Sequence, residues 1–201
     1  MTEASVWQRA LGDDYELLSP GLRDYFARPP EGTVGRGSGR YEVAGSSRRW
    51  LRPVLVVLAW RRILFPEFGH GIPFTVTNTP AGAALRGWRT FDFPSRTRVI
   101  QDEMRIVDGR LHDFLGRNGE LEARLELEVV AGALHLRTGR LWLNLGRVRL
   151  ALPRLARIRL TEQSAENGQR VSAVLSSPVI GDWFEYTGTF TYNYVSSSDP
   201  R

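Results

Sequence analysis

The sequence predicts a mainly β protein of the α+β class. We expect a long curved antiparallel meander or a β-barrel that encloses a central buried helix, with short N-terminal helices. Two observations support this prediction. From residue 71 onward, apolar and polar residues alternate, which is the period of a half-buried strand. Turn signals such as Asp108-Gly109 and Asn118-Gly119 separate the alternating runs, as in β-hairpins.

Residues 1–31 are expected to form a helical N-terminal part with one break. The apolar spacing of Ala4–Leu11 and of Pro20–Ala27 is typical of short surface helices. Ser19 directly before Pro20 provides an N-cap and a first-turn residue for the second of these helices.

The next two segments lead into the sheet. Gly32–Gly39 is rich in glycine but lacks a following Gly-Lys-Ser/Thr, so we interpret it as a flexible lead into a strand at Arg40–Ala44. Ser46–Leu64 has an apolar middle flanked by arginines, and Pro53 lies near its start. A short, nearly fully buried helix is the favoured interpretation of this segment. A buried strand is the alternative, because several of the apolar residues are β-branched.

The remaining chain reads as strands. The clearest is the run from Glu120, in which leucine, alanine and valine alternate with glutamate and arginine, as in an antiparallel strand with one wet face. The predicted strands are Ile72–Asn78, Leu85–Phe93, Arg98–Val107, Arg110–Leu115, Glu120–Val129, Leu134–Leu145, Ala156–Thr161, Gln169–Ser176 and Trp183–Val195. Residues 1–195 are therefore expected to form a single domain, with the helix and the sheet in residues 40–195, and residues 196–201 a disordered tail.

Composition excludes several classes of protein. The 201 residues include no cysteine, so disulfides and thiolate metal sites are excluded. The N-terminus lacks the pattern of a signal peptide. The longest apolar run, Val54–Trp60, is far shorter than the about 18 residues of a membrane span. We therefore expect a soluble, cytoplasmic protein with no membrane span.

The charge pattern also argues against one class of partner. The net charge is +5, and all 27 basic residues are arginine. These arginines are spread along the chain and interleaved with aspartate and glutamate, whereas a nucleic-acid surface needs them clustered. A GC-rich genome, which favours arginine codons, accounts for the composition. We therefore predict no nucleic-acid partner.

A candidate site follows from polar residues on the inward phase of the strands. Strand alternation places Asn78 with Phe74, and Arg89 with Phe91, on the apolar side. Such groups are costly to bury unless something partners them. Asp102 and Asp113 break the alternation in the same way, and Tyr186 and Tyr192 bring hydroxyl groups to an aromatic face of the last strand.

An apolar wall with a few polar anchors is the usual composition of a small-molecule site. The predicted catalytic residues are Arg89, Asp113 and Tyr186. The predicted substrate-binding residues are Asn78, Phe91, Asp102, Phe74, Trp60 and Tyr192. A purely structural ion-pair network is the alternative, because buried Arg–Asp pairs are often only structural.

No cofactor or metal is predicted. The three histidines, His70, His112 and His135, show no metal spacing. The chain also lacks a Gly-x-Ser-x-Gly motif, a dinucleotide fingerprint before a helix and a His-Glu-x-x-His motif. Hydride transfer and metallohydrolase mechanisms therefore have no support in the sequence.

Several segments carry a family resemblance. The most specific are Arg61–Glu67, which reads Arg-Arg-x-x-Phe-Pro-Glu, and Arg89–Pro94, which reads Arg-Thr-Phe-x-Phe-Pro. Pro73-Phe74 with Asn78, Asp113–Gly116 and Tyr186–Phe190 also match. On these segments the chain resembles a bacterial family catalogued as domain of unknown function number 4166, in its stand-alone form. Some relatives resemble the C-terminal partner of a nucleotide-dependent dehydrogenase-like domain. The resemblance implies no activity.

Three functions remain open. The first is a cofactor-independent cyclase or isomerase of bacterial secondary metabolism, acting on an apolar small molecule such as a polyketide. In that case Arg89 or Tyr186 polarises a carbonyl, and Asp113 acts as a general acid or base. The second is a non-catalytic binder or carrier of a hydrophobic small molecule. The third is an accessory domain that contacts a dehydrogenase. A homodimer is left open.

Overall fold

The protein is a β-barrel capped at both ends by helices. The computed structural model describes residues 4–153 and 156–198. The strands in this part of the chain are β1 (Thr33–Gly45), β2 (Phe68–Ala81), β3 (Ala84–Phe93), β4 (Arg96–Val107), β5 (Arg110–Leu115), β6 (Leu121–Val130), β7 (Ala133–Leu145), β8 (Val148–Ala151), β9 (Arg157–Ala165), β10 (Gly168–Ser177) and β11 (Gly181–Ser196). They agree closely with the predicted strands, apart from β1 and β8.

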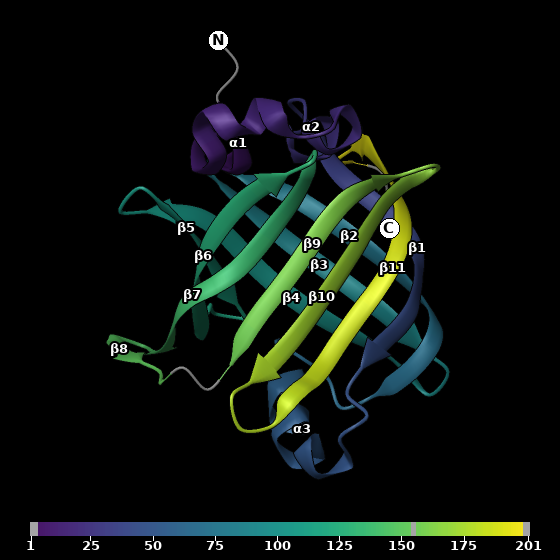
Figure 1. The fold of residues 1–201 in the computed structure, drawn as a ribbon, viewed down its shortest axis with the longest axis vertical. Helices are drawn as coiled ribbons and strands as arrows, with labels where there is room; N and C mark the ends of the chain where they lie inside the picture. Colours follow the sequence, from purple (N-terminus) through teal and green to yellow (C-terminus); the bar gives the residue numbers. More distant parts are fainter. Residues whose placement is uncertain (1–3, 154–155, 199–201) are drawn as a thin grey trace.

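All strand pairs are antiparallel, and the sheet closes on itself (Figure 1). Strands β1 to β7 follow one another as a meander, β7 then pairs with β9, and β11 returns to pair with β1. The pairing of β6 with β7 completes a ring of ten strands within the described residues, while β8 pairs with the lower half of β7 alone. The predicted antiparallel meander is confirmed, in its closed form.

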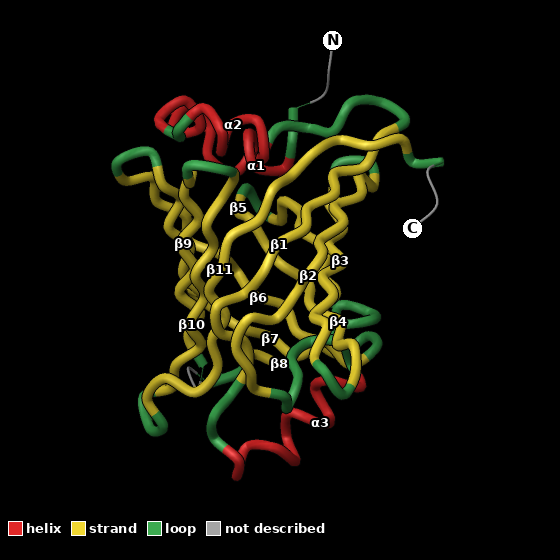
Figure 2. Tube along the Cα trace, turned by 90° about the vertical axis from the view of Figure 1, so that its right-hand side faces the viewer, coloured by secondary structure: helices red, strands yellow, loops and turns green. Residues whose placement is uncertain are grey.

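Short helices lie at the two ends of the barrel (Figures 1 and 2). Across one end lie α1 (Val6–Leu11), the 3₁₀ helix η1 (Gly12–Leu17) and α2 (Pro20–Phe26), as the N-terminal helical prediction requires. At the opposite end lie the 3₁₀ helix η2 (Arg49–Leu51) and α3 (Arg52–Trp60). In the described residues, no helix has both the length and the apolar character needed to cross a membrane.

The prediction of a central buried helix is wrong. Helix α3 lies outside the barrel, at its end, and Leu55 is the residue that it buries (Figure 2). Val57 is 59% exposed and Trp60 is 64% exposed. The interior has no room for a helix because strand side chains such as Tyr41 and Phe91 already fill it.

The prediction of a flexible glycine-rich lead is also wrong, because Gly35, Gly37 and Gly39 lie within β1. A Cβ added at Gly35 would lie 1.6 Å from the Tyr192 hydroxyl, and one added at Gly37 would lie 3.0 Å from the Phe190 ring. Glycine is therefore required here by close packing: its missing side chain leaves space for aromatic residues of β11.

The core has two apolar clusters along the barrel axis. The cluster near α3 is aromatic and tightly packed, with Tyr41 stacked on Phe74 at 3.9 Å between ring centroids. The cluster under α1 and α2 is mostly aliphatic and includes Trp7, Leu22 and Phe26 of the helices. Polar side chains gather inside the barrel between these two clusters.

Candidate functional site

Neighbouring strands β2 to β5 bring four predicted residues together inside the barrel. Asn78, Arg89, Asp102 and Asp113 each come from one of these strands, on the inward phase. Arg89 Nη1 donates a hydrogen bond to Asp102 Oδ1 and forms an ion pair with it. The Asp102 side chain is only 3% exposed, so its charge depends on this partner.

Side chains from the opposite wall and from the N-terminal helices complete the cluster. Tyr192 of β11 accepts a hydrogen bond of 3.2 Å from Asn78 Nδ2, and the ring of Tyr25 in α2 lies 4.6 Å from the Tyr192 ring. Tyr186 lies close enough to Arg89 for their charges to interact. Predicted residues of β2 to β5 and of β11, which are distant in sequence, therefore meet in one place.

Glu162 of β9 is a cluster residue that sequence reasoning missed. The predicted strand ends at Thr161, whereas β9 continues to Ala165. The alternation of Ile158, Leu160 and Glu162 is the signal that could have placed this carboxylate inward. Tyr25 carries no such signal, because its contact depends on how α2 crosses the barrel end.

Burial and mutual charge set the protonation of the cluster. Burial raises the pKa of Asp113 well above its usual range, Asp102 adds to this effect, and Arg89 opposes it. Burial likewise raises the pKa of Glu162 to about 7, against the opposing charge of Arg89. Although burial alone would lower the pKa of Arg89, Asp102 raises it well above the usual value. Burial therefore outweighs the charge of Arg89 at both Asp113 and Glu162, and the Glu162 carboxyl has a pKa close to neutral pH.

Two oxygen atoms of the cluster are buried without a hydrogen-bond partner among the described residues. These atoms are Asp113 Oδ1 and Glu162 Oε2. Buried polar atoms in native proteins nearly always have partners, so each orphan atom needs an explanation, such as water or a ligand. Carboxyls with raised pKa values beside a fixed cation are also the usual components of acid–base sites.

A small cavity of about 30 Å³ lies within the cluster. Its lining includes Asn78, Arg89 and Glu162, together with Trp7 of α1 and Tyr25 of α2. This volume holds a water molecule but not an organic substrate, whose sites typically span about 300–1,000 Å³. A larger ligand therefore requires α1 and α2 to move, because they supply one wall of the cavity.

The other predicted site residues lie apart from this cavity. Phe74 and Phe91 are buried in the aromatic cluster near α3, where both stack on Tyr41. Trp60 lies on the outside of α3, with the Arg61 guanidinium 4.6 Å from its ring centroid. The structure therefore assigns these three aromatic residues to packing and to the surface.

Comparison with known proteins identifies the family. A family model described as "Domain of unknown function (DUF4166)" matches residues 18–190. The chain belongs to the DUF4166 family. The "Uncharacterized protein YndH" of Bacillus subtilis (strain 168) is 26% identical over 200 residues, which is 93% of this chain and 96% of that protein. No solved structure matches the chain.

The segments that carry the family resemblance meet in the barrel interior. Asn78, Arg89, Asp113 and Tyr186 each belong to one of those segments. They come from β2, β3, β5 and β11, which are distant in sequence, and they face the same polar cluster. The interior cluster is therefore the candidate functional site of this DUF4166 protein.

An open groove of about 690 Å³ on the outside of β1, β2, β3 and β11 is the competing location. Several of its polar groups already have partners, and no carboxyl group lines it. Arg86 pairs with Glu103 at 2.8 Å, and the hydroxyl groups of Thr75 and Thr90 lie 2.6 Å apart. The groove thus lacks the unpartnered carboxyl oxygens that single out the interior.

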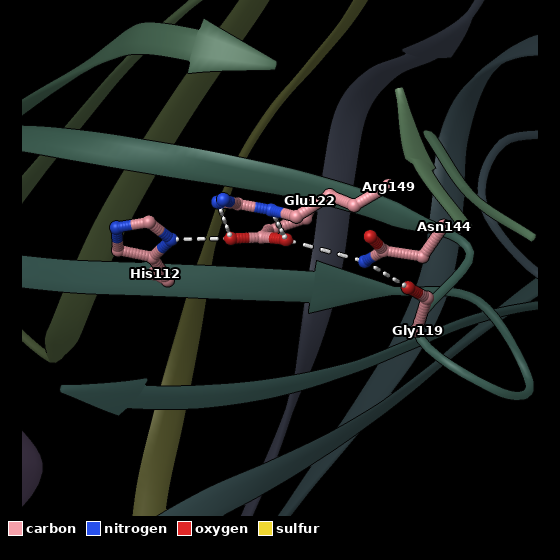
Figure 3. Close-up of polar contacts among 5 residues, drawn as sticks. All are labelled: His112, Gly119, Glu122, Asn144 and Arg149. Atoms are coloured by element: carbon pink, nitrogen blue, oxygen red, sulfur yellow. Dashed lines mark hydrogen bonds and ion pairs between the residues drawn. The ribbon is translucent and has the colours of Figure 1, made fainter. Parts of the chain in front are cut away.

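A second polar cluster lies on the outer face of β5, β6 and β7 (Figure 3). His112 Nδ1 lies 2.7 Å from Glu122 Oε1, and Arg149 donates to both oxygens of Glu122 at 2.9 and 2.6 Å. Burial raises the pKa of Glu122, but hydrogen bonds from Arg149, His112 and Asn144 outweigh it and lower the pKa overall. Both carboxylate oxygens of Glu122 therefore have hydrogen-bond partners, and we interpret this cluster as a structural contact that attaches β8 to the outside of the barrel.

Among the described residues, no group of three or more His, Asp or Glu side chains is placed to hold a metal ion.

The bond between Asn78 and Tyr192 gives a first prediction. Replacing Tyr192 with phenylalanine should lower the free energy of unfolding by about 1–2 kcal/mol, since the buried Asn78 amide loses its acceptor. Urea unfolding at pH 7 measures the change. Tyr194→Phe is the matched control, because its hydroxyl binds the half-exposed backbone of α2. A loss of stability in the control as large as in Tyr192→Phe would contradict this assignment.

Proposed function

We propose that the barrel interior binds a small molecule with an apolar body and a carbonyl or carboxylate head, and isomerises or cyclises it without a cofactor. A polyene or polyketide of bacterial secondary metabolism fits this description. The observation that carries the proposal is the pair of unpartnered carboxyl oxygens, on Asp113 and Glu162, gathered near Arg89.

Each polar side chain has a role in such a reaction. Arg89 and the Tyr186 hydroxyl would polarise the carbonyl oxygen and stabilise the negative charge that develops on it. Glu162, whose pKa is about 7, would take a proton from the carbon next to the carbonyl and return it elsewhere on the same molecule. Burial raises the pKa of Asp113, which favours the protonated form, and in that form Asp113 would donate a further hydrogen bond.

The apolar body of the ligand would lie against aliphatic side chains. Met104, Leu136 and Leu160 line the same cavity as Arg89. A sealed, apolar surrounding strengthens the interaction of Arg89 with the head group and excludes water from the reacting atoms. Holding a flexible chain in a folded shape also lowers the barrier to ring closure.

Entry would require α1 and α2 to swing away from the barrel end. Their attachments to the strands include a contact of 2.7 Å between the hydroxyls of Ser19 and Ser164, and a 3.0 Å hydrogen bond from Ser19 N to Gly132 O. Further links run from Arg9 to Ala83 O, from Gln169 to Gly21 O and from Tyr194 to Asp24 O, and opening must break them. We treat α1, η1 and α2 together as a lid.

The experiment uses cis-parinaric acid, a polyene carboxylate whose fluorescence rises in apolar surroundings, to measure binding. Conversion is followed with a long-chain β,γ-unsaturated ketone, because its isomerisation to the conjugated α,β-isomer moves a proton from the carbon next to the carbonyl to another carbon of the same molecule. We expect saturable binding by the wild-type protein and conversion of the ketone to this isomer of unchanged mass. Glu162→Gln should retain binding and slow the conversion by at least about 100-fold, the usual contribution of a general acid or base.

Four outcomes separate the parts of the proposal. Binding without conversion would overturn the enzyme and leave the carrier as the function. Equal conversion by Glu162→Gln would remove Glu162 from the mechanism. Weaker binding of the methyl ester, which lacks the charge, is expected if Arg89 recognises the head group. No binding of either compound would contradict the interior site for this ligand class.

A further inference from the structure

We propose that the α3 end of the barrel docks on the surface of an anionic lipid bilayer. Large apolar side chains lie exposed at this end. Trp50 is 62% exposed and Trp60 is 64% exposed, and Val54 and Val57 between them are 58% and 59% exposed. Phe68, at the start of β2, is a further exposed apolar side chain, at 42%. Exposed apolar clusters of this kind mark interaction sites.

The exposed side chains come from separate segments that share one end of the molecule. Helix α3 projects from the same end of the barrel as the turn that joins β10 to β11 (Figures 1 and 2). That turn carries Val179, which is 87% exposed. We call the exposed apolar side chains of residues 50–60, Phe68 and Val179 the α3 face.

The shape of the α3 face favours a fluid surface over a rigid groove. Leu55 anchors α3 to the barrel, while Val54, Val56, Val57 and Trp60 spread around the remaining sides of this short helix. A groove on a protein partner would cover one stripe of such a helix, whereas lipid can surround the whole exposed surface. Tryptophan is also the residue most typical of the boundary between headgroups and acyl chains.

The arginines around the α3 face favour an anionic lipid over a neutral one. Arg48, Arg49 and Arg52 are exposed beside the α3 face, and none has an acidic partner in the part of the chain that the structure describes. Two acids at this end of the barrel, Glu67 and Asp182, are paired with arginines. Glu67 accepts two hydrogen bonds from Arg98, at 2.7 and 2.8 Å, and Asp182 pairs with Arg159 at 3.3 Å.

Unpaired arginines around an apolar tip are typical of proteins that bind anionic lipid surfaces. The α3 face is therefore both apolar and cationic, which is complementary to anionic headgroups over an acyl layer. The inference is independent of the proposed reaction, since no residue of the interior cluster takes part in it.

The test is flotation of the full chain with large vesicles. Vesicles of phosphatidylcholine with about one third phosphatidylglycerol should bind the protein and shift its tryptophan emission to the blue. Vesicles of phosphatidylcholine alone should bind it at least tenfold more weakly, and high salt should release it.

Two variants and a matched control locate the contact. Val57→Glu, an exposed change that leaves the fold intact, should weaken binding at least tenfold. Arg48→Gln with Arg49→Gln should do the same, because each arginine near an anionic surface contributes severalfold. Arg110→Gln with Arg137→Gln makes the same charge change on exposed residues of β5 and β7 and should leave binding unchanged.

Absence of binding to anionic vesicles would overturn the proposal, as would equal loss in the control pair. A dimer in solution that Val57→Glu dissociates, without vesicle binding, would assign the face to a second copy of the chain and also overturn it. Glu162→Gln should bind vesicles like the wild type, so failure here is distinguishable from failure of the interior site.

Discussion

Arg89→Ala should lower the free energy of unfolding by about 3–5 kcal/mol. The loss arises because Asp102, 3% exposed, would keep a buried charge without its partner. Two further carboxyls, on Asp113 and Glu162, would lose the cation that opposes the effect of burial on them. Urea denaturation at pH 7, followed by tryptophan fluorescence, measures the change. A loss below about 1 kcal/mol would show that the pair is not buried as described.

A double variant distinguishes two causes of the instability of Arg89→Ala: the unpaired charge of Asp102 and the lost packing of the Arg89 side chain. Arg89→Met with Asp102→Leu removes both charges and keeps most of the side-chain volume. It should recover most of the stability, because replacing a whole buried ion pair by apolar residues is often neutral. If the double variant is as unstable as Arg89→Ala, the damage comes from altered packing instead.

Glu162→Gln should stabilise the protein at pH 8 by up to about 3 kcal/mol. The folded protein raises the pKa of Glu162 from 4.5 to about 7, so folding favours the protonated form. Below pH 4.5 the Glu162 carboxyl is protonated in the folded and in the unfolded protein, so it does not lower the free energy of unfolding. Between pH 4.5 and 7 the unfolded chain releases the proton first, and the free energy of unfolding falls by about 1.4 kcal/mol per pH unit.

Above pH 7 both states are ionised and the penalty is constant. Unfolding curves between pH 4 and 8 should therefore show a slope in the wild type that Glu162→Gln reduces. Glu185→Gln, a change at an exposed residue of β11, should leave the wild-type profile intact. A wild-type profile that rises from pH 4.5 to 7, and that Glu162→Gln does not alter, would contradict the burial of this carboxyl.

The strands and their inward faces can be read from the sequence, because side-chain alternation is a local property. Alternation alone places Asn78, Arg89 and Asp102 on the inner face of the sheet. Closure of the barrel cannot be read in this way. It depends on which distant strands pair, as β11 does with β1, and alternation is the same in an open sheet.

The wrong predictions and the missed residues can each be traced to particular segments. An apolar run such as Val54–Trp60 looks the same whether a helix is buried or presents an apolar face to the outside. Gly35–Gly39 resembles a loop because glycine disfavours strands, and the need for space against Tyr192 appears only once β11 is in place. Glu162 is missed because the predicted strand ends at Thr161, whereas β9 continues to Ala165. Tyr25 is missed because residue spacing does not encode how a helix docks.

The central claim is that the interior cluster is a ligand site reached by displacing the lid. The Ser19 and Ser164 hydroxyls lie 2.7 Å apart, between α2 and β9. Because the chain has no cysteine, Ser19→Cys with Ser164→Cys introduces a single disulfide bond, which holds the lid closed. The decisive measurement is the rate of cis-parinaric acid uptake by this variant, oxidised and then reduced. Uptake should be at least about tenfold slower in the oxidised form and should return to the wild-type rate on reduction. Equal rates in the two forms would contradict the claim.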